Sequence, residues 1–297
     1  MIDTSASNLL PPEIDLSGVV GNVGSYPSLM VSDIAAAPDI TTDDYALEQA
    51  NGNERKTLNY LIPMVKAHNA KTVLDVGCGI GEMVRTFLNH GYSAYGVDLI
   101  GLHRHWKHIG LPTQRMFVID PGVLRLPFHA NSIDFIYTLG VIEHVGTSNG
   151  LSRRLPNYHA IREAWLRELY RVVKPGGAML IAGPNRHFPF DTAHDLDWES
   201  TPLERWLSRR LKASVHRIHG EYFLWAYEDI GRYLHGLPHV VHPQSLKGFI
   251  EFSRVPSWFK PLTRAYVERM PQFLLGTGFN PWMIALVSKP VNASETV

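Results

Sequence analysis

The sequence Val-Leu-Asp-Val-Gly-Cys-Gly-Ile-Gly at residues 73–81 decides how this chain folds. An apolar run of β type ends at Val76, glycine then occupies every second position, and a helical pattern starts at Glu82. Glycine permits a sharp turn and leaves no side chain between the loop and a ligand, and the first turn of a helix presents free N–H groups. Such a turn at the carboxyl edge of a parallel sheet predicts a nucleotide-binding site.

Short apolar runs and helical stretches alternate around this turn. Strands are expected over residues 72–76, 93–97, 116–119, 133–137, 178–182 and 283–287. Helices are expected over 82–90 and 158–173, the second because apolar residues recur there at helical spacing on one face. Strand, helix, strand at this spacing predicts crossover units, and therefore an α/β fold with a doubly wound, mostly parallel sheet covered on both faces.

The flanking regions do not share this alternation. Residues 1–53 are expected to form an irregular arm over the main domain, with a disordered tail as the alternative for 1–16. A helix with a break near Pro63 is expected over 54–68. Residues 184–250 show no clear strand. The predicted domains are an arm at 1–53, a core at 54–185, a cap at 186–280, and a last strand with its tail at 281–297.

The composition excludes several classes of protein. The 297 residues carry 28 Lys+Arg and 28 Asp+Glu, and this balance argues against a general nucleic-acid-binding surface. The single cysteine, Cys78, rules out an internal disulfide and a cysteine-rich zinc site. No apolar run approaches the roughly 18 residues that cross a bilayer, and the N-terminus lacks the pattern of a secretory signal. We expect a soluble, cytoplasmic protein, whose oligomeric state the sequence leaves open.

Two acidic residues refine the prediction for the glycine loop. A dinucleotide-binding loop would have its third glycine at position 82, where this chain has Glu82, a carboxylate that disfavours a diphosphate and tolerates a cationic ligand. Asp98 ends the next strand, 23 positions after Asp75, where a carboxylate can accept hydrogen bonds from both hydroxyls of a ribose. The alternative for Asp98 is a helix cap or a turn.

The central part of the chain resembles the class I S-adenosylmethionine-dependent methyltransferases, of the small-molecule group that includes the ubiquinone-type enzymes. The matching stretches, in the family's order and spacing, are VLDVGCGIG (73–81), YGVDL (95–99), LPF (126–128), NSIDFIYTLGVIEHV (131–145) and LRELYRVVKPGGAMLIAGPN (166–185). The resemblance implies a Rossmann-like, seven-stranded sheet with an acceptor-binding cap, and S-adenosyl-L-methionine as cofactor. The alternatives are a nicotinamide-dependent oxidoreductase and a non-catalytic protein that binds S-adenosylmethionine.

The resemblance also implies which residues contact the cofactor. They are Asp75, Gly77, Cys78, Gly79, Gly81, Asp98, Leu99, Asp120, Gly122 and Leu139. Gly122 occupies the position at which the family usually has its adenine-contacting aspartate, and Asp120 is followed by Pro121, which has no N–H to offer. Some ubiquinone-type enzymes bind a divalent metal through Glu-x-x-Glu-His. Gly140 replaces the first of these carboxylates, so no metal is expected.

Methyl transfer to a hydroxyl needs an aligned acceptor and is helped by a base that removes the proton. His144 follows the expected fourth strand, beside Glu143, and ordering the start of a helix is the alternative role for this pair. His187 and Asp191, after the fifth strand, form the second candidate base, with substrate contact or loop capping as alternatives. His187, Asp191 and His194 match no standard zinc spacing.

The expected partner is a small-molecule acceptor with a natural-product, quinone-like or sugar-derived hydroxyl. One further stretch, 203–218, has an apolar helical stripe and a basic opposite side. This pattern favours a helix that covers a core with a solvated face. The alternative is contact with a phosphate-bearing or lipid-linked acceptor, or peripheral contact with an anionic membrane surface.

Overall fold

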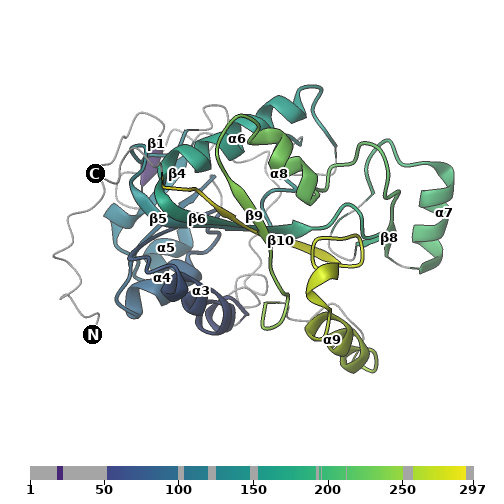
Figure 1. Cartoon of the computed structure of the whole chain (residues 1–297), viewed down its shortest axis with the longest axis horizontal. Coiled ribbons are helices and arrows are strands. Elements are labelled where there is room, and N and C mark those ends of the chain that lie inside the picture. Colours follow the sequence, from purple (N-terminus) through teal and green to yellow (C-terminus); the bar gives the residue numbers. More distant parts are fainter. Residues whose placement is uncertain are drawn as a thin grey trace. The chain divides into compact units, whose positions relative to one another are not determined.

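A computed structural model describes residues 19–22, 52–99, 104–119, 125–147, 153–191, 194, 196–211, 213–249 and 257–291 (Figure 1). The main sheet consists of β1 (Val19–Asn22), β2 (Thr72–Val76), β3 (Ser93–Asp98), β4 (Met116–Ile119), β5 (Ile133–Leu139), β6 (Val173–Pro184), β9 (Val240–Pro243) and β10 (Trp282–Ser288). A separate small sheet pairs β7 (Phe190–Asp191) with β8 (Ser214–Val215). The α-helices are α3 (Ile62–Ala67), α4 (Glu82–Asn89), α5 (Arg104–His108), α6 (Tyr158–Val172), α7 (Pro202–Leu211), α8 (Tyr227–Tyr233) and α9 (Lys260–Glu268). Short 3₁₀ turns are η5 (Thr113–Arg115) and η7 (Gln272–Leu274).

The strand order is β1-β4-β3-β2-β5-β6-β10-β9. β2 pairs in parallel with β3 on one side and with β5 on the other, so the strand order reverses direction at β2. Ligands of open α/β sheets bind at the carboxyl ends of strands beside such a switch point. The predicted doubly wound α/β sheet is confirmed, and the predicted strands over 72–76 and 116–119 have the observed bounds.

Two expectations for the sheet were incomplete. β1, from the arm expected to be irregular, pairs antiparallel with β4 and makes the sheet eight-stranded. β9 lies in the region where no strand was evident. Both strands have four residues, too few for a period of two to stand out, and hydrogen bonds to an existing edge decide such short strands.

The chain divides into two compact units. The first comprises residues 1–138, 167–179 and 288–297, and the second comprises 139–166 and 180–287. The predicted boundaries of arm, core, cap and tail stay a prediction.

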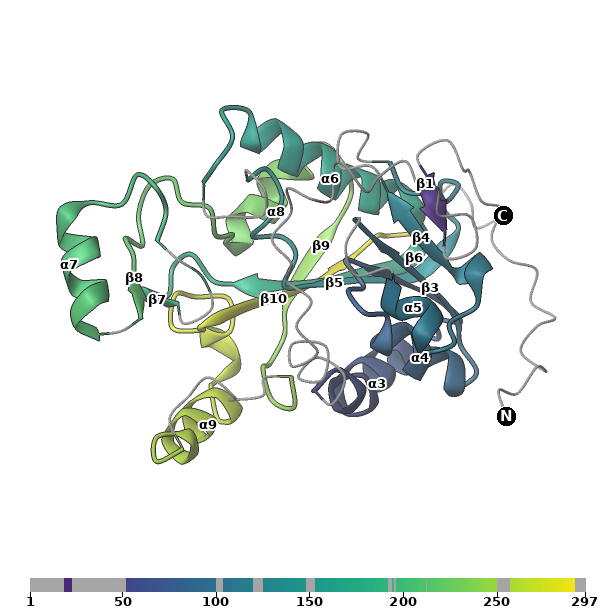
Figure 2. The ribbon, with the colours of Figure 1, turned by 180° about the vertical axis from the view of Figure 1, so that it is seen from behind.

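The first unit has its core around β2. Val73 and Leu74 are buried because a parallel strand is covered on both faces, and α4 contributes the buried side chains of Val84 and Phe87. Where a break near Pro63 was expected, the helix continues: a π-helical turn, η4 (Thr57–Leu61), passes directly into α3, which has the proline in its first turn. Seen from behind, α3 and α4 lie side by side (Figure 2).

Asp134 of β5 connects its strand to the start of β2 and to Lys174 of β6. Its carboxylate accepts hydrogen bonds from the backbone N–H groups of Lys71 (2.9 Å) and Thr72 (2.8 Å) and from Lys174 Nζ (2.6 Å). Partial burial alone would raise the pKa of Asp134, but these hydrogen bonds outweigh it and lower the pKa. The ionised carboxylate is therefore part of the folded structure.

We predict that Asp134→Asn lowers the free energy of unfolding at pH 7 by about 1.5 kcal/mol, the low end of the range of about 1.5–3 kcal/mol for hydrogen bonds to a charged group, because the side chain is partly exposed. Because the folded-state pKa lies below the unfolded value, the contribution of Asp134 is present above about pH 4 and lost as the pH falls further. Urea unfolding of both proteins across this range should show the difference shrinking at low pH. An equal difference at every pH would contradict this account.

The second unit is organised around buried aromatic side chains and the buried guanidinium of Arg162. Arg162 donates from Nε to the carbonyl of Val145 (2.9 Å) and from Nη2 to the carbonyl of Phe223. Its guanidinium lies 5.2 Å from the ring centroid of Trp225. Burial lowers the pKa of Arg162 to about 10, so the side chain stays charged at neutral pH and must keep these partners.

The helix expected over 203–218 is shorter than its pattern indicates. α7 ends at Leu211, and Val215 belongs to β8, so the apolar stripe does not continue on one helix. The side chains of Leu203, Trp206 and Leu211 are exposed, which contradicts the expectation that this stripe covers a core. Within the described residues, no helix combines the length and apolarity needed to cross a membrane.

Candidate functional site

The glycine loop after β2 adopts a conformation that requires its glycines. Gly77, Gly79 and Gly81 all have positive φ (84°, 54° and 83°), a region that residues with a Cβ rarely enter. The N–H groups of Gly77 and Cys78 both donate to the carbonyl of Val97, at 2.9 and 3.1 Å. The alternating glycines therefore turn the chain against the end of β3 and start α4 at Gly81.

Asp98 ties the end of β3 to this loop. Its Oδ2 accepts the N–H of Gly79 at 2.5 Å, and its Oδ1 accepts the N–H of Leu99 at 2.7 Å. Burial raises the pKa of Asp98 to about 6, although both hydrogen bonds oppose the shift. Trp106 also supports the loop, because its Nε1–H donates to the carbonyl of Gly79 at 2.7 Å.

A second carboxylate, Asp75, lies at the end of β2, opposite Gly96 of β3. The side chain is buried. Burial raises its pKa well above the usual value, and the charge of Asp98 acts in the same direction. Two neighbouring carboxylates with raised pKa values favour a ligand that brings positive charge, since a cation stabilises their ionised forms. S-adenosylmethionine has a sulfonium and an ammonium group, so this loop and its carboxylates fit the predicted cofactor.

Glu82 occupies the predicted position, where a dinucleotide loop would have glycine. The side chain is buried and pairs with Arg85 of the same helix. Because Arg85 balances its charge, the electrostatic argument against a diphosphate at this helix end is weaker than the sequence indicates. The distinction from a dinucleotide site rests instead on Asp98 and Asp75.

The remaining predicted cofactor residues have different surroundings. Cys78 is buried, and its Sγ lies 3.0 Å from where a Cβ on Gly96 would stand, so its side chain packs against the sheet. Leu99 is exposed beside Asp98, and Leu139 is half-buried at the end of β5. Asp120 and Gly122 lie outside the described residues. Trp106 was not predicted, because no spacing in the sequence links it to Gly79, which lies 27 positions earlier.

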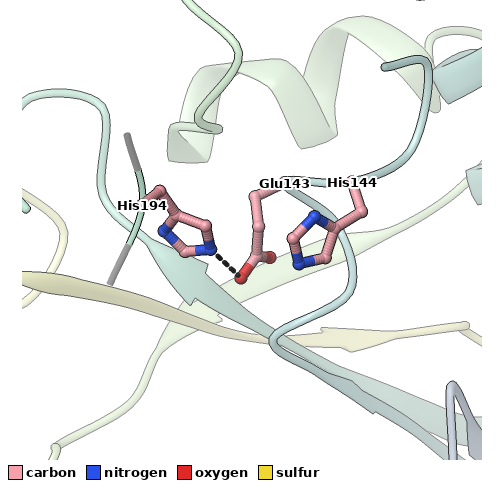
Figure 3. A group of neighbouring side chains, drawn as sticks. All are labelled: Glu143, His144 and His194. Atoms are coloured by element: carbon pink, nitrogen blue, oxygen red, sulfur yellow. Dashed lines mark ion pairs between the residues drawn. The ribbon is translucent and has the colours of Figure 1, made fainter. Parts of the chain in front are cut away.

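The second unit contains a cluster of imidazole and carboxylate groups, the Glu–His cluster of Glu143, His144 and His194 (Figure 3). His194 Nε2 lies 3.5 Å from Glu143 Oε1, and the rings of His144 and His194 have centroids 5.4 Å apart. Asp191 Oδ2 lies 2.8 Å from His194 Nδ1. Glu143 is buried and burial raises its pKa, whereas His144 is exposed.

The predicted pairing of His187 with Asp191 is wrong. His187 Nε2 bonds to Glu228 Oε1 at 2.6 Å and its Nδ1 lies 2.9 Å from the carbonyl of Ile218, whereas Asp191 bonds to His194. Glu228 and Ile218 are 41 and 31 positions from His187. Sequence spacing alone could not reveal such partners, and it could not decide which of two nearby histidines faces Asp191.

Comparisons with known proteins place the chain among methyltransferases. A profile of the family described as "Methyltransferase domain" matches residues 48–247, more than half of the chain. The chain is 27% identical over 158 residues to "Probable pectin methyltransferase QUA3" of Arabidopsis thaliana, covering 52% of this chain and 23% of that protein. It is 25% identical over 166 residues to malonyl-[acyl-carrier protein] O-methyltransferase of Yersinia pestis, covering 54% of each chain.

The matched regions cover only part of each of these two relatives. The chain spans between 23% and 54% of the lengths of the two curated proteins named above. Among solved structures, the PH0226 protein of Pyrococcus horikoshii OT3 aligns over 89% of this chain and 100% of its own, with a TM-score of 0.45 and 12% sequence identity.

Proposed function

The chain belongs to the methyltransferase-domain family, whose methyl donor is S-adenosylmethionine, and we propose that it methylates a hydroxyl oxygen of a small molecule. The observation that supports the cofactor part of this proposal is Asp98, a carboxylate at the end of β3 that is bonded to the glycine loop at the switch point of the sheet. This is the position from which a carboxylate can accept hydrogen bonds from both hydroxyls of a ribose.

The residues of the first unit would hold the cofactor. When bound, S-adenosylmethionine supplies a methyl group on a positively charged sulfur. The loop from Gly77 to Gly81 would bring backbone close to the ligand without intervening side chains, and Asp98 would accept from the ribose. Asp75 offers a buried carboxyl group whose ionised form a cationic ligand would stabilise. Leu139, the last residue of β5, belongs to the second unit, and its contact with the amino-acid end of the cofactor stays a prediction from the resemblance.

Binding should depend on pH through Asp98. Protonation puts an O–H donor in place of an acceptor site on the carboxylate and removes its charge, so protonation competes with the ligand. Because the pKa of Asp98 is about 6, affinity for S-adenosylhomocysteine should fall as the pH drops below 6, by up to about tenfold per pH unit, and level off above about 7. Calorimetric titrations from pH 5 to 8 measure this, and Asp98→Asn should flatten the profile even though Asp75 remains. A flat profile in the unaltered protein would contradict the assignment.

In this proposal, residues of the second unit take up the proton of the acceptor's hydroxyl group. His144 is exposed beside Glu143, and Asp191 acts through His194, to which it is hydrogen-bonded. His187 is given a positioning role, because its two ring nitrogens are engaged by Glu228 and Ile218. The name of the Yersinia pestis relative, an O-methyltransferase, supports oxygen as the acceptor atom.

Transfer of a labelled methyl group tests the proposal. The protein is incubated with S-adenosylmethionine carrying a deuterated methyl group and the small-molecule fraction of a cell extract, and products are followed by mass spectrometry. We expect a labelled product whose methyl group is bonded to oxygen and whose formation stops with Asp98→Ala. Cofactor binding without any labelled product would favour a non-catalytic binding protein, and a methyl group on nitrogen or carbon would overturn the acceptor. A cytoplasmic location is part of the proposal, which cell fractionation tests.

A further inference from the structure

We propose that Glu143, His144 and His194 bind a divalent transition-metal ion, with Zn²⁺ as the best fit, and that Asp191 orients His194 from behind. The sequence indicates the opposite, because Gly140 takes the place of a carboxylate that a known metal motif would require. The structure supplies the third ligand from His194, 51 residues after Glu143. The site lies within the second unit and needs no residue of the first.

The geometry of the cluster suits one ion. Each of the three residues offers a ligand atom, and these atoms all lie within 4.8 Å of one another. Metal–ligand distances of about 2.0–2.2 Å put neighbouring ligand atoms roughly 3–4 Å apart, so small side-chain rotations close the set. Figure 3 shows the carboxylate of Glu143 between the two imidazole rings.

Asp191 determines which nitrogen of His194 is available. Its carboxylate lies 2.8 Å from Nδ1, so this nitrogen carries a hydrogen and Nε2 of the neutral ring carries a lone pair. Nε2 lies 3.5 Å from Glu143 Oε1, which is also an acceptor. A cation between them removes the conflict of two acceptors, and a carboxylate behind a metal-binding histidine is a common supporting arrangement. The competing occupant is a proton, which would make His194 an imidazolium between two carboxylates.

Glu143 provides a second indication of a bound metal ion. The side chain is 2% exposed, and its Oε2 has no hydrogen-bond partner among the described residues. Gly183 packs against this oxygen, because a Cβ there would stand 3.0 Å from Oε2 and 2.7 Å from Ile142 Cγ1. Burying a carboxylate oxygen without a partner is costly, and coordination of a metal ion is one of the few arrangements that offset the cost.

The ligand types select the ion. Two imidazole nitrogens with one carboxylate suit Zn²⁺, Fe²⁺, Co²⁺ or Ni²⁺, whereas Mg²⁺ and Ca²⁺ prefer oxygen ligands. Three protein ligands leave a coordination position open. An oxygen ligand such as water would take that position.

Binding of the metal alone tests the site. The full chain, freed of metal by a chelator that is then removed, is titrated calorimetrically with Zn²⁺ in the absence of S-adenosylmethionine. We expect one ion per chain with micromolar or tighter affinity. Glu143→Gln and His194→Ala should each weaken it by about 100-fold or more, and Asp191→Asn by about 10- to 100-fold. His159→Ala is the matched control, because His159 also pairs with a glutamate, Glu221 at 3.1 Å, outside the cluster, and it should change nothing.

Cobalt provides a second readout that a folding defect would not imitate. Co²⁺ bound at the site should give visible absorption that Zn²⁺ displaces and that His144→Gln diminishes, with circular dichroism unchanged. Absence of stoichiometric binding, or binding that the cluster variants leave unaltered, overturns the site in favour of the protonated His194. A protein that binds no Zn²⁺ but still binds S-adenosylhomocysteine loses only this inference, whereas loss of S-adenosylhomocysteine binding removes the proposed function.

Discussion

Replacing Asp98 with alanine is expected to weaken the binding of S-adenosylhomocysteine by about 100-fold or more. The carboxylate would accept two hydrogen bonds from the ribose, each worth about 1.5–3 kcal/mol when one partner is charged. Loss of both corresponds to at least about 3 kcal/mol, and each 1.4 kcal/mol is a factor of ten. The substitution also removes the acceptor of the Gly79 N–H, which lies 2.5 Å from the carboxylate, so the loop is less constrained. Isothermal titration calorimetry at pH 7.5 measures the change.

Two further variants show whether the loss of affinity is caused by the missing carboxylate of Asp98. Asp98→Asn keeps the shape of the side chain and one acceptor oxygen, so its affinity should lie between those of the unaltered protein and the alanine variant. Glu54→Ala removes an exposed carboxylate of the same unit and should leave affinity unchanged. An alanine variant that binds within threefold of the unaltered protein would refute the ribose role.

Gly81→Ala is expected to lower the free energy of unfolding by about 2–5 kcal/mol. Gly81 has φ of +83°, which costs a residue with a Cβ about 1–2 kcal/mol. The new methyl group would also overlap Leu111 Cδ1 and stand 3.2 Å from Trp106 Cδ1 and 3.3 Å from Met116 Cε. Overpacking of this kind adds about 1–3 kcal/mol. Because Trp106 also bonds to Gly79, affinity for S-adenosylhomocysteine should fall too.

Gly91→Ala separates the two causes. Gly91 has nearly the same φ, +81°, but a Cβ there meets nothing within 4 Å. Its cost should therefore be limited to the backbone contribution of about 1–2 kcal/mol, with ligand affinity unchanged. Chemical unfolding of both variants measures the difference. Equal costs would show that the side chains around Gly81 can move aside at little cost.

The sequence predicts the first unit well because its strongest signals are local. Each of these signals lies within a few consecutive residues: the apolar runs of β2 and β4, and the alternating glycines of the loop. Asp98 was found in the same way, because it is the last residue of a strand. Patterns of this kind depend on the period of a strand and on the conformations open to glycine. Trp106 was missed because its role depends on a hydrogen bond across 27 positions.

The second unit could be predicted less well because its contacts join distant segments. His194 meets Glu143 across 51 positions, and His187 meets Glu228 across 41. No periodicity links such residues, so the wrong histidine was paired with Asp191. The break of the apolar stripe after Leu211 was likewise hidden, because Val215 pairs with Phe190 of β7 instead of continuing the helix.

Parallel titrations of the unaltered protein with S-adenosylhomocysteine and with NADH test the central assignment most directly. If the site made of the glycine loop, Asp75 and Asp98 holds an adenosine attached to sulfur, S-adenosylhomocysteine should bind with one site per chain and micromolar affinity, and NADH should not compete. Binding of NADH without S-adenosylhomocysteine would contradict it.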